Sequence, residues 1–133
     1  MDIYESDAPL VLVVEDGLLV AMAIEDALAD RGLQVVVAST LEAADRVLAR
    51  RLPDVALLDL QLPDGLSLNL ASLLHGAGCR VALCSGLDSG VVPESHSFAI
   101  QFRKPTSPDL LADWVVTVLA HPEETACSRS GTG

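Results

Sequence analysis

Residues 55–65, VALLDLQLPDG, join an unbroken apolar run to a single carboxylate and a turn. The run 55–58, which follows a proline and an aspartate, has the composition of a strand buried on both faces of a parallel sheet. Asp59 then falls at the carboxyl end of this strand, the edge at which ligands and chemistry collect in open α/β sheets. The alternative is that Asp59 only caps the turn that the following Pro-Asp-Gly completes.

Length and composition indicate one ordered domain with an aliphatic core. The chain has 133 residues, of which 50% are hydrophobic and 3% aromatic. Its formal charge of −11 repels phosphate backbones, so we expect no direct nucleic-acid binding and favour basic protein partners or metal ions. No apolar run is long enough for a membrane span, no export leader is evident, and the three cysteines lack metal-ligand spacing. We therefore expect a cytoplasmic protein with no membrane contact.

Short apolar strands alternate with helical segments along the chain. The expected strands are 10–14, 33–38, 55–58, 80–84 and 98–102, and the expected helices are 17–31, 66–75 and 108–120, with one more helix after a capping box of Ser39 and Glu42. Residues 88–97 contain Gly90, Pro93 and few apolar side chains, so the fourth helix should be short or irregular. This alternation predicts an α/β, doubly wound five-stranded parallel sheet with helices on both faces.

The helical spacing also predicts which side chains are buried. It assigns Leu18 and Met22 of the first helix, and Leu110 of the last, to apolar faces. Residues 10–120 form the predicted domain, flanked by a flexible N-terminus (1–9) and a disordered tail (121–133).

Polar side chains follow four of the predicted strands. Glu15 and Asp16 come after the first strand, Asp59 after the third, Ser85 after the fourth, and Lys104, the only lysine of the chain, after the fifth. Because the carboxyl ends of parallel strands meet at one edge of a sheet, we expect these side chains to lie together. Three carboxylates in one place raise each other's pKa unless a cation lies among them, and Mg²⁺ suits few carboxylates and several waters.

This set of side chains is typical of phosphoryl transfer. With a metal ion present, one oxygen of Asp59 can attack phosphorus, while Lys104 supplies a mobile positive charge and Ser85 a hydrogen-bond donor. Each residue alone also has an ordinary structural explanation, as a helix cap, a turn cap or a surface lysine. Their joint arrival at one edge favours the chemical explanation.

Four stretches, LVLVVED, LLDLQLPDG, LCSG and FRKP in this order, resemble the receiver domain of two-component response regulators from about Leu10 to Ala120. The resemblance implies the flavodoxin-like strand order 2-1-3-4-5. It makes Asp59 the acceptor of a phosphoryl group from the phosphohistidine of a histidine kinase or phosphotransfer protein. The signal would then pass to an unknown downstream protein through protein contacts.

The resemblance also implies a role for each site residue. Asp16 would bind Mg²⁺ directly together with Asp59, Glu15 would help through water, and the backbone carbonyl of Gln61 would complete the protein ligands. Ser85 and Lys104 would contact the phosphoryl group.

Two positions depart from the usual receiver pattern. Gln101 stands three residues before the lysine, where most receivers have a switch aromatic, and Thr106 follows the Lys104–Pro105 pair, where a bulky residue is common. The resemblance also implies that the peptide of that pair is cis. The stretch LCSGL is similar to the FATGY-type motif of an atypical single-domain receiver subfamily that also lacks the aromatic. We therefore place the switch region at Gly86, Leu87 and Gln101.

Two other classes of protein remain as alternatives. An unphosphorylated pseudo-receiver would keep the fold as a protein-binding module, and the missing switch aromatic and broken fourth helix favour it slightly. The complete acceptor and metal set argues against it. A haloacid-dehalogenase-type phosphatase would need a second aspartate two residues after the nucleophile, where Gln61 stands. We therefore expect a phospho-acceptor signalling domain that assists only its own phosphorylation and dephosphorylation, and not an enzyme.

Overall fold

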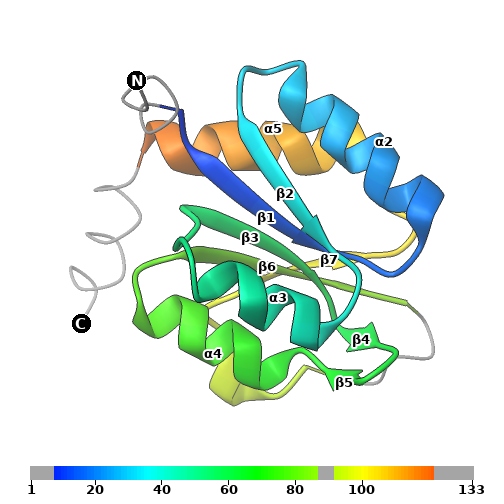
Figure 1. Ribbon diagram of the computed structural model, residues 1–133, viewed down its shortest axis with the longest axis vertical. Coiled ribbons are helices and arrows are strands. Elements are labelled where there is room, and N and C mark those ends of the chain that lie inside the picture. Colours follow the sequence, from blue (N-terminus) through cyan, green and yellow to red (C-terminus); the bar gives the residue numbers. More distant parts are fainter. Residues whose placement is uncertain (1–7, 87–91, 122–133) are drawn as a thin grey trace.

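Five parallel strands form the central sheet, in the spatial order β2-β1-β3-β6-β7 (Figure 1). The computed structural model describes residues 8–86 and 92–121, so the predictions for the N-terminal residues, Leu87 and the tail lie outside the described residues. The strands are β1 Leu10–Val14, β2 Gln34–Ala38, β3 Val55–Asp59, β6 Arg80–Ser85 and β7 Ile100–Arg103. Since β6 and β7 are the fourth and fifth strands of this sheet along the chain, the predicted order 2-1-3-4-5 is confirmed.

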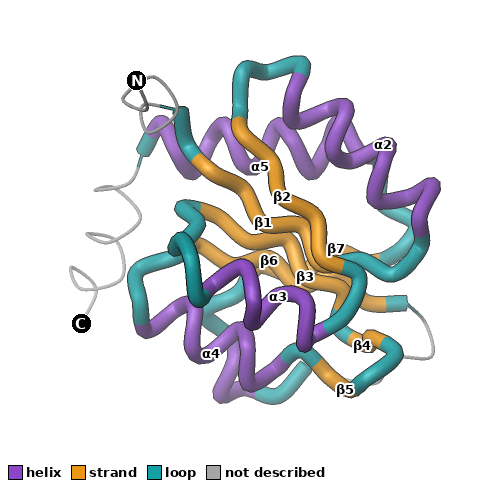
Figure 2. Tube along the Cα trace, in the orientation of Figure 1, coloured by secondary structure: helices purple, strands orange, loops and turns teal. Residues whose placement is uncertain are grey.

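Helices cover both faces of the sheet (Figure 2). On one face lie α2 (Leu18–Ala29) and α5 (Pro108–Ala120), and on the other α3 (Leu41–Leu48) and α4 (Leu68–Gly76). The core consists of two clusters, one on each face of the sheet. Successive residues of β1 and β3 belong alternately to one cluster and the other, because side chains of a strand point to opposite faces in turn. Asp59 continues the series of Val55 and Leu57, which face α2 and α5.

Residues 88–91 of the predicted fourth helical segment lie outside the described residues, and the described remainder agrees with the short helix expected. Within the described residues it consists of one 3₁₀ turn, η1, at Glu94–His96. Strand β7 begins at Ile100, two residues later than predicted, because Ala99 N–H still donates to the His96 carbonyl at 3.1 Å and prolongs the turn.

The third helix is capped differently from the prediction. Ser39 is not its cap, since the chain is still extended at Thr40, whose Oγ1 accepts the Ala43 N–H at 3.0 Å. The Asp64 carboxylate also accepts the Leu41 and Glu42 N–H groups, at 2.9 and 3.1 Å. These backbone hydrogen bonds lower the pKa of Asp64.

An unpredicted hairpin brings Asp64 to the start of α3. Its strands are β4 (Gln61–Leu62) and β5 (Gly65–Leu66), which pair antiparallel. Gly65 has φ +139°, a conformation that favours glycine, and this allows the tight reversal after Asp64. The hairpin joins the end of β3 to α4, so the predicted helix start at residue 66 was two residues early.

The buried helix faces are narrower than the spacing predicted. In α2 the buried residues are Ala21, Ile24, Ala27 and Leu28, whereas Leu18 is 72% and Met22 49% exposed. Leu110 of α5 is 53% exposed, because the buried stripe begins one residue later at Leu111. One residue turns a helical side chain by about 100°, enough to move it off such a stripe.

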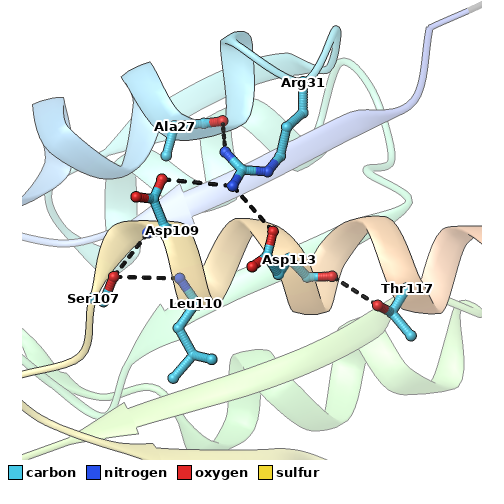
Figure 3. A network of polar contacts seen from close by, with 7 residues as sticks. All are labelled: Ala27, Arg31, Ser107, Asp109, Leu110, Asp113 and Thr117. Atoms are coloured by element: carbon cyan, nitrogen blue, oxygen red, sulfur yellow. Dashed lines mark hydrogen bonds and ion pairs between the residues drawn. The ribbon is translucent and has the colours of Figure 1, made fainter.

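Arg31, just after α2, connects this helix to α5 (Figure 3). Its guanidinium donates to the Ala27 carbonyl at 2.8 Å and pairs with Asp113 at 3.0 Å and Asp109 at 3.5 Å. Both carboxylates are largely exposed, so these ion pairs contribute little to the free energy of unfolding.

Cys79 and Cys84 are free thiols of the core. Burial raises the pKa of each to about 12, so neither forms a thiolate at neutral pH. No helix within the described ranges is both long and apolar enough to cross a membrane.

The cap assignment gives the first prediction. Thr40→Ala should lower the free energy of unfolding by about 1 kcal/mol, because the Ala43 N–H loses its acceptor. Ser39→Ala is the matched control at the neighbouring, exposed position and should change it by less than about 0.5 kcal/mol. Urea unfolding of both variants would measure this, and equal losses would contradict the assignment.

Candidate functional site

An ion-paired cluster lies at the carboxyl edge of the sheet. The Lys104 ammonium is 2.9 Å from Asp59 Oδ1 and 3.2 Å from Glu15 Oε1. Both carboxylates are buried, with Glu15 6% and Asp59 7% exposed, and the Lys104 side chain is 32% exposed. One partly buried cation is thus shared by two buried anions.

The strand register explains why these side chains meet. β1 and β3 are parallel neighbours with Val14 opposite Leu58, so Glu15 and Asp59 occupy equivalent positions at adjacent strand ends. Lys104 directly follows β7, and its N–H donates to the Ser85 carbonyl at 2.8 Å. The Lys104–Pro105 peptide is cis, as predicted.

Asp16 completes a group of three acids. Carboxylate oxygens of Glu15, Asp16 and Asp59 all lie within 4.8 Å of one another, and Asp16 is exposed to solvent. Glu15 Oε2 also accepts the Gly17 N–H at 2.9 Å, so Glu15 is held from both sides. With one ammonium for three carboxylates the cluster keeps excess negative charge, and its all-oxygen donor set fits a hard divalent cation such as Mg²⁺.

Burial dominates the protonation of Asp59. Burial and the charges of Glu15 and Asp16 together raise the pKa of Asp59 from 3.8 to about 6, against the opposing hydrogen bond and charge of Lys104. Burial also lowers the pKa of Lys104, but its bonds to Asp59 and Glu15 outweigh this, so its pKa is raised and the amine stays protonated. The cluster therefore holds a cationic lysine beside a carboxyl group that titrates unusually high.

The other predicted site residues that the structure describes lie at or near the ends of β6, β4 and β7. Ser85 closes β6 and is half-buried, Gln61 opens β4 and is exposed, and Gln101 is exposed on the edge strand β7. Gly86 is half-buried after β6, and Leu87 lies outside the described residues. The assigned roles of these residues stay predictions.

One residue of the site was missed from the sequence. Ser67 is fully buried, and its Oγ donates to the Asp59 carbonyl at 2.8 Å. A serine before the apolar run at Leu68 could have been recognised as a helix cap. The hydrogen bond from Ser67 to the Asp59 carbonyl forms only because the hairpin of β4 and β5 folds back. No short sequence pattern indicates this bond.

Comparison with known proteins agrees with this geometry. The family model for the response regulator receiver domain matches residues 11–92. The transcriptional regulatory protein KdpE of Mycobacterium tuberculosis is 42% identical over 67 residues, which cover 50% of this chain and 30% of that protein. The virulence transcriptional regulatory protein PhoP of Salmonella typhimurium is 48% identical over 60 residues, 44% of this chain and 27% of that protein. The matched region is thus less than a third of either relative.

Solved structures show the same fold over most of the chain. A CheY-like receiver domain from Methanospirillum hungatei superposes with a TM-score of 0.74 at 21% identity, covering 88% of this chain and 98% of that one. SdrG from Sphingomonas melonis gives a TM-score of 0.70 at 25% identity, covering 84% and 97%.

The pKa of Asp59 predicts how stability depends on pH. Between pH 3.8 and about 6 the folded protein keeps a proton on Asp59 that the unfolded chain releases, so the free energy of unfolding should fall as pH rises through this range. Asp59→Asn lacks this titration, so its free energy of unfolding should rise relative to that of the wild type by about 3 kcal/mol between pH 3.8 and pH 6.

Urea unfolding in chelator across this pH range would measure the difference. Asp26→Asn, the same substitution at an exposed position of α2, is the control and should follow the wild type. A constant difference between Asp59→Asn and wild type at all pH values would contradict the assignment.

Proposed function

Because the chain belongs to the family of response regulator receiver domains, we propose that Asp59 accepts a phosphoryl group from the phosphohistidine of a histidine kinase or phosphotransfer protein. Receiver domains are signalling modules, and this one would signal through protein contacts. The observation that carries the proposal is the Lys104 ammonium, 2.9 Å from a buried Asp59 among two further carboxylates. This complete set does not favour an unphosphorylated pseudo-receiver.

The residues would divide the transfer step as follows. A carboxylate oxygen of Asp59 attacks phosphorus, the bond from phosphorus to the donor's imidazole nitrogen breaks, and the electron pair leaves with the imidazole. Above its pKa of about 6, Asp59 is ionised and needs no base to become a nucleophile. Lys104 then shifts its charge toward the phosphoryl oxygens, and the Ser85 hydroxyl donates to one of them.

The acidic cluster would hold Mg²⁺. Asp16 and Asp59 would bind it directly, the Gln61 carbonyl would be a third ligand, and Glu15 would act through water. Support comes from the carboxylate oxygens within 4.8 Å of one another. When bound, the ion offsets the negative charge of the acids and of the incoming phosphoryl group.

The extent of the signalling unit is part of the proposal. The described elements run from Leu10 to Ala120, which supports a domain at 10–120 with segments 1–9 and 121–133 as flanks. Because the matched region is under a third of the curated relatives, their output activities are not transferred to this chain. A cytoplasmic location is proposed on the two buried free thiols.

The signal would leave through the segment after Ser85. Gln101 is exposed and cannot act as a ring that moves into an apolar slot. None of the three residues of η1 is buried, and His96 connects this turn to α4, with its Nε2 2.8 Å from the Leu68 carbonyl and 3.0 Å from Ser72 Oγ. A segment with few apolar anchors can change its packing at small cost in free energy.

Labelling with acetyl phosphate tests the acceptor and the metal. With Mg²⁺, the intact mass of the wild type should rise by one phosphoryl group, and chelator should abolish this. Asp59→Asn should remain unlabelled, and Asp16→Ala should lose both Mg²⁺ binding and labelling.

Asp26→Asn serves again as the control and should be labelled at the wild-type rate. Labelling of Asp59→Asn would refute the acceptor, and a full labelling rate in excess chelator would refute the metal role.

Hydrogen exchange tests the route of the signal. Phosphorylation adds about −1.5 to −2 charge beside Ser85 and Lys104, so exchange should change between residues 87 and 97 and little around Gln101. Gln101→Ala should leave this response nearly intact. Changes confined to α2 and α4, or loss of the response in Gln101→Ala, would indicate another route.

A further inference from the structure

We infer that Ser67 is a positioning residue for Asp59, because its buried hydroxyl fixes the peptide group that follows the acceptor. The inference deepens the proposed function of Asp59 and rests on it. Ser67 acts on the backbone at the end of β3. The residues given roles in phosphoryl transfer and metal binding act on the Asp59 side chain instead.

Ser67 makes its contacts with the end of β3. Its Oγ donates to the Asp59 carbonyl at 2.8 Å and lies 3.4 Å from the Leu60 carbonyl, while its N–H donates to the Leu60 carbonyl at 2.9 Å. Its side chain is 0% exposed, so water cannot replace the hydroxyl unless α4 moves away. The Ser67 carbonyl accepts the Ala71 N–H at 2.9 Å in the first turn of α4.

The peptide between Asp59 and Leu60 is thereby held at both ends. On one side Ser67 binds its carbonyl, and on the other its N–H donates to the Cys84 carbonyl of β6 at 2.9 Å. A peptide group is planar, so two bonds in opposite directions fix its orientation. The peptide plane sets the direction in which the Asp59 side chain leaves the strand, and hence the place of its carboxylate beside Lys104.

The direction of the hydroxyl separates this role from helix capping. Serine just before a helix usually accepts an N–H of the first turn. Among the described residues, Ser67 Oγ caps no N–H of α4, and the backbone there has φ −88° and ψ 13° in place of an extended cap conformation. The hydroxyl serves the strand that carries Asp59, and not the helix that follows it.

Two substitutions distinguish positioning from packing. Ser67→Ala removes the hydroxyl, and Ser67→Cys refills its space with only a weak donor. If the hydroxyl positions Asp59, both variants should be labelled by acetyl phosphate about tenfold more slowly than the wild type at saturating Mg²⁺, because small misplacements of a reacting group are costly in rate. If Ser67 only packs, the cysteine variant should regain the wild-type rate, which would overturn the inference.

Hydrogen exchange of the Leu60 amide in chelator provides a readout independent of labelling. It should quicken in both variants, because the peptide is then held at one end only. Unchanged exchange together with a wild-type labelling rate would also overturn the inference. Should the wild type itself take no label, the proposed function fails, while this readout still tests whether Ser67 fixes the peptide.

Asp54→Ala is the matched control at the opposite end of β3. It removes another side-chain bond to the backbone, from the Leu10 N–H to Asp54 Oδ2 at 2.8 Å, far along the strand from Asp59. This variant should lose stability but keep the wild-type labelling rate. An equal loss of rate in Asp54→Ala would show that the rate follows overall stability, against a positioning role.

Discussion

Lys104 lies between two buried carboxylates, at 2.9 Å from Asp59 and 3.2 Å from Glu15, and the arrangement of the whole sheet edge depends on this shared cation. Two anions in one low-dielectric place repel each other strongly, and a single ammonium offsets only part of that repulsion. Burial, together with this repulsion, raises the pKa of Asp59 to about 6 despite the lysine. A site with this excess of negative charge favours the approach of a further cation.

The parts of the fold that bring these charges together could be predicted from the sequence. Buried parallel strands appear as short unbroken apolar runs, and residues directly after such runs must gather at one edge. Glu15 and Asp59 were found in this way, and Lys104 stood out as the only lysine of the chain. The order of the strands came from the resemblance to receivers and not from the pattern itself.

The contacts of residues 60–67, which follow Asp59, could not be predicted. They join residues that are too far apart in the sequence for a short sequence pattern to connect them. Asp64 caps a helix that begins 23 residues earlier in the chain, and Ser67 binds back to Asp59. The exact buried face of each helix was also not predictable from the sequence. Helical spacing identified the apolar residues of α2, but only the packing shows that Leu18 remains largely exposed.

Asp59 is thus restrained by two separate elements. Its backbone is tied to the start of α4 through Ser67, and its carboxylate is tied to the end of β7 through Lys104. Transfer of a phosphoryl group would alter only the second restraint, because Lys104 carries a mobile charge while Ser67 binds a peptide carbonyl that takes no part in the reaction. The movement would therefore reach the β7 end and the segment after Ser85, whose carbonyl accepts the Lys104 N–H, before it reached α4. A backbone held at both ends beside a lysine that can reorient would let the proposed acceptor stay in place while contacts around it change.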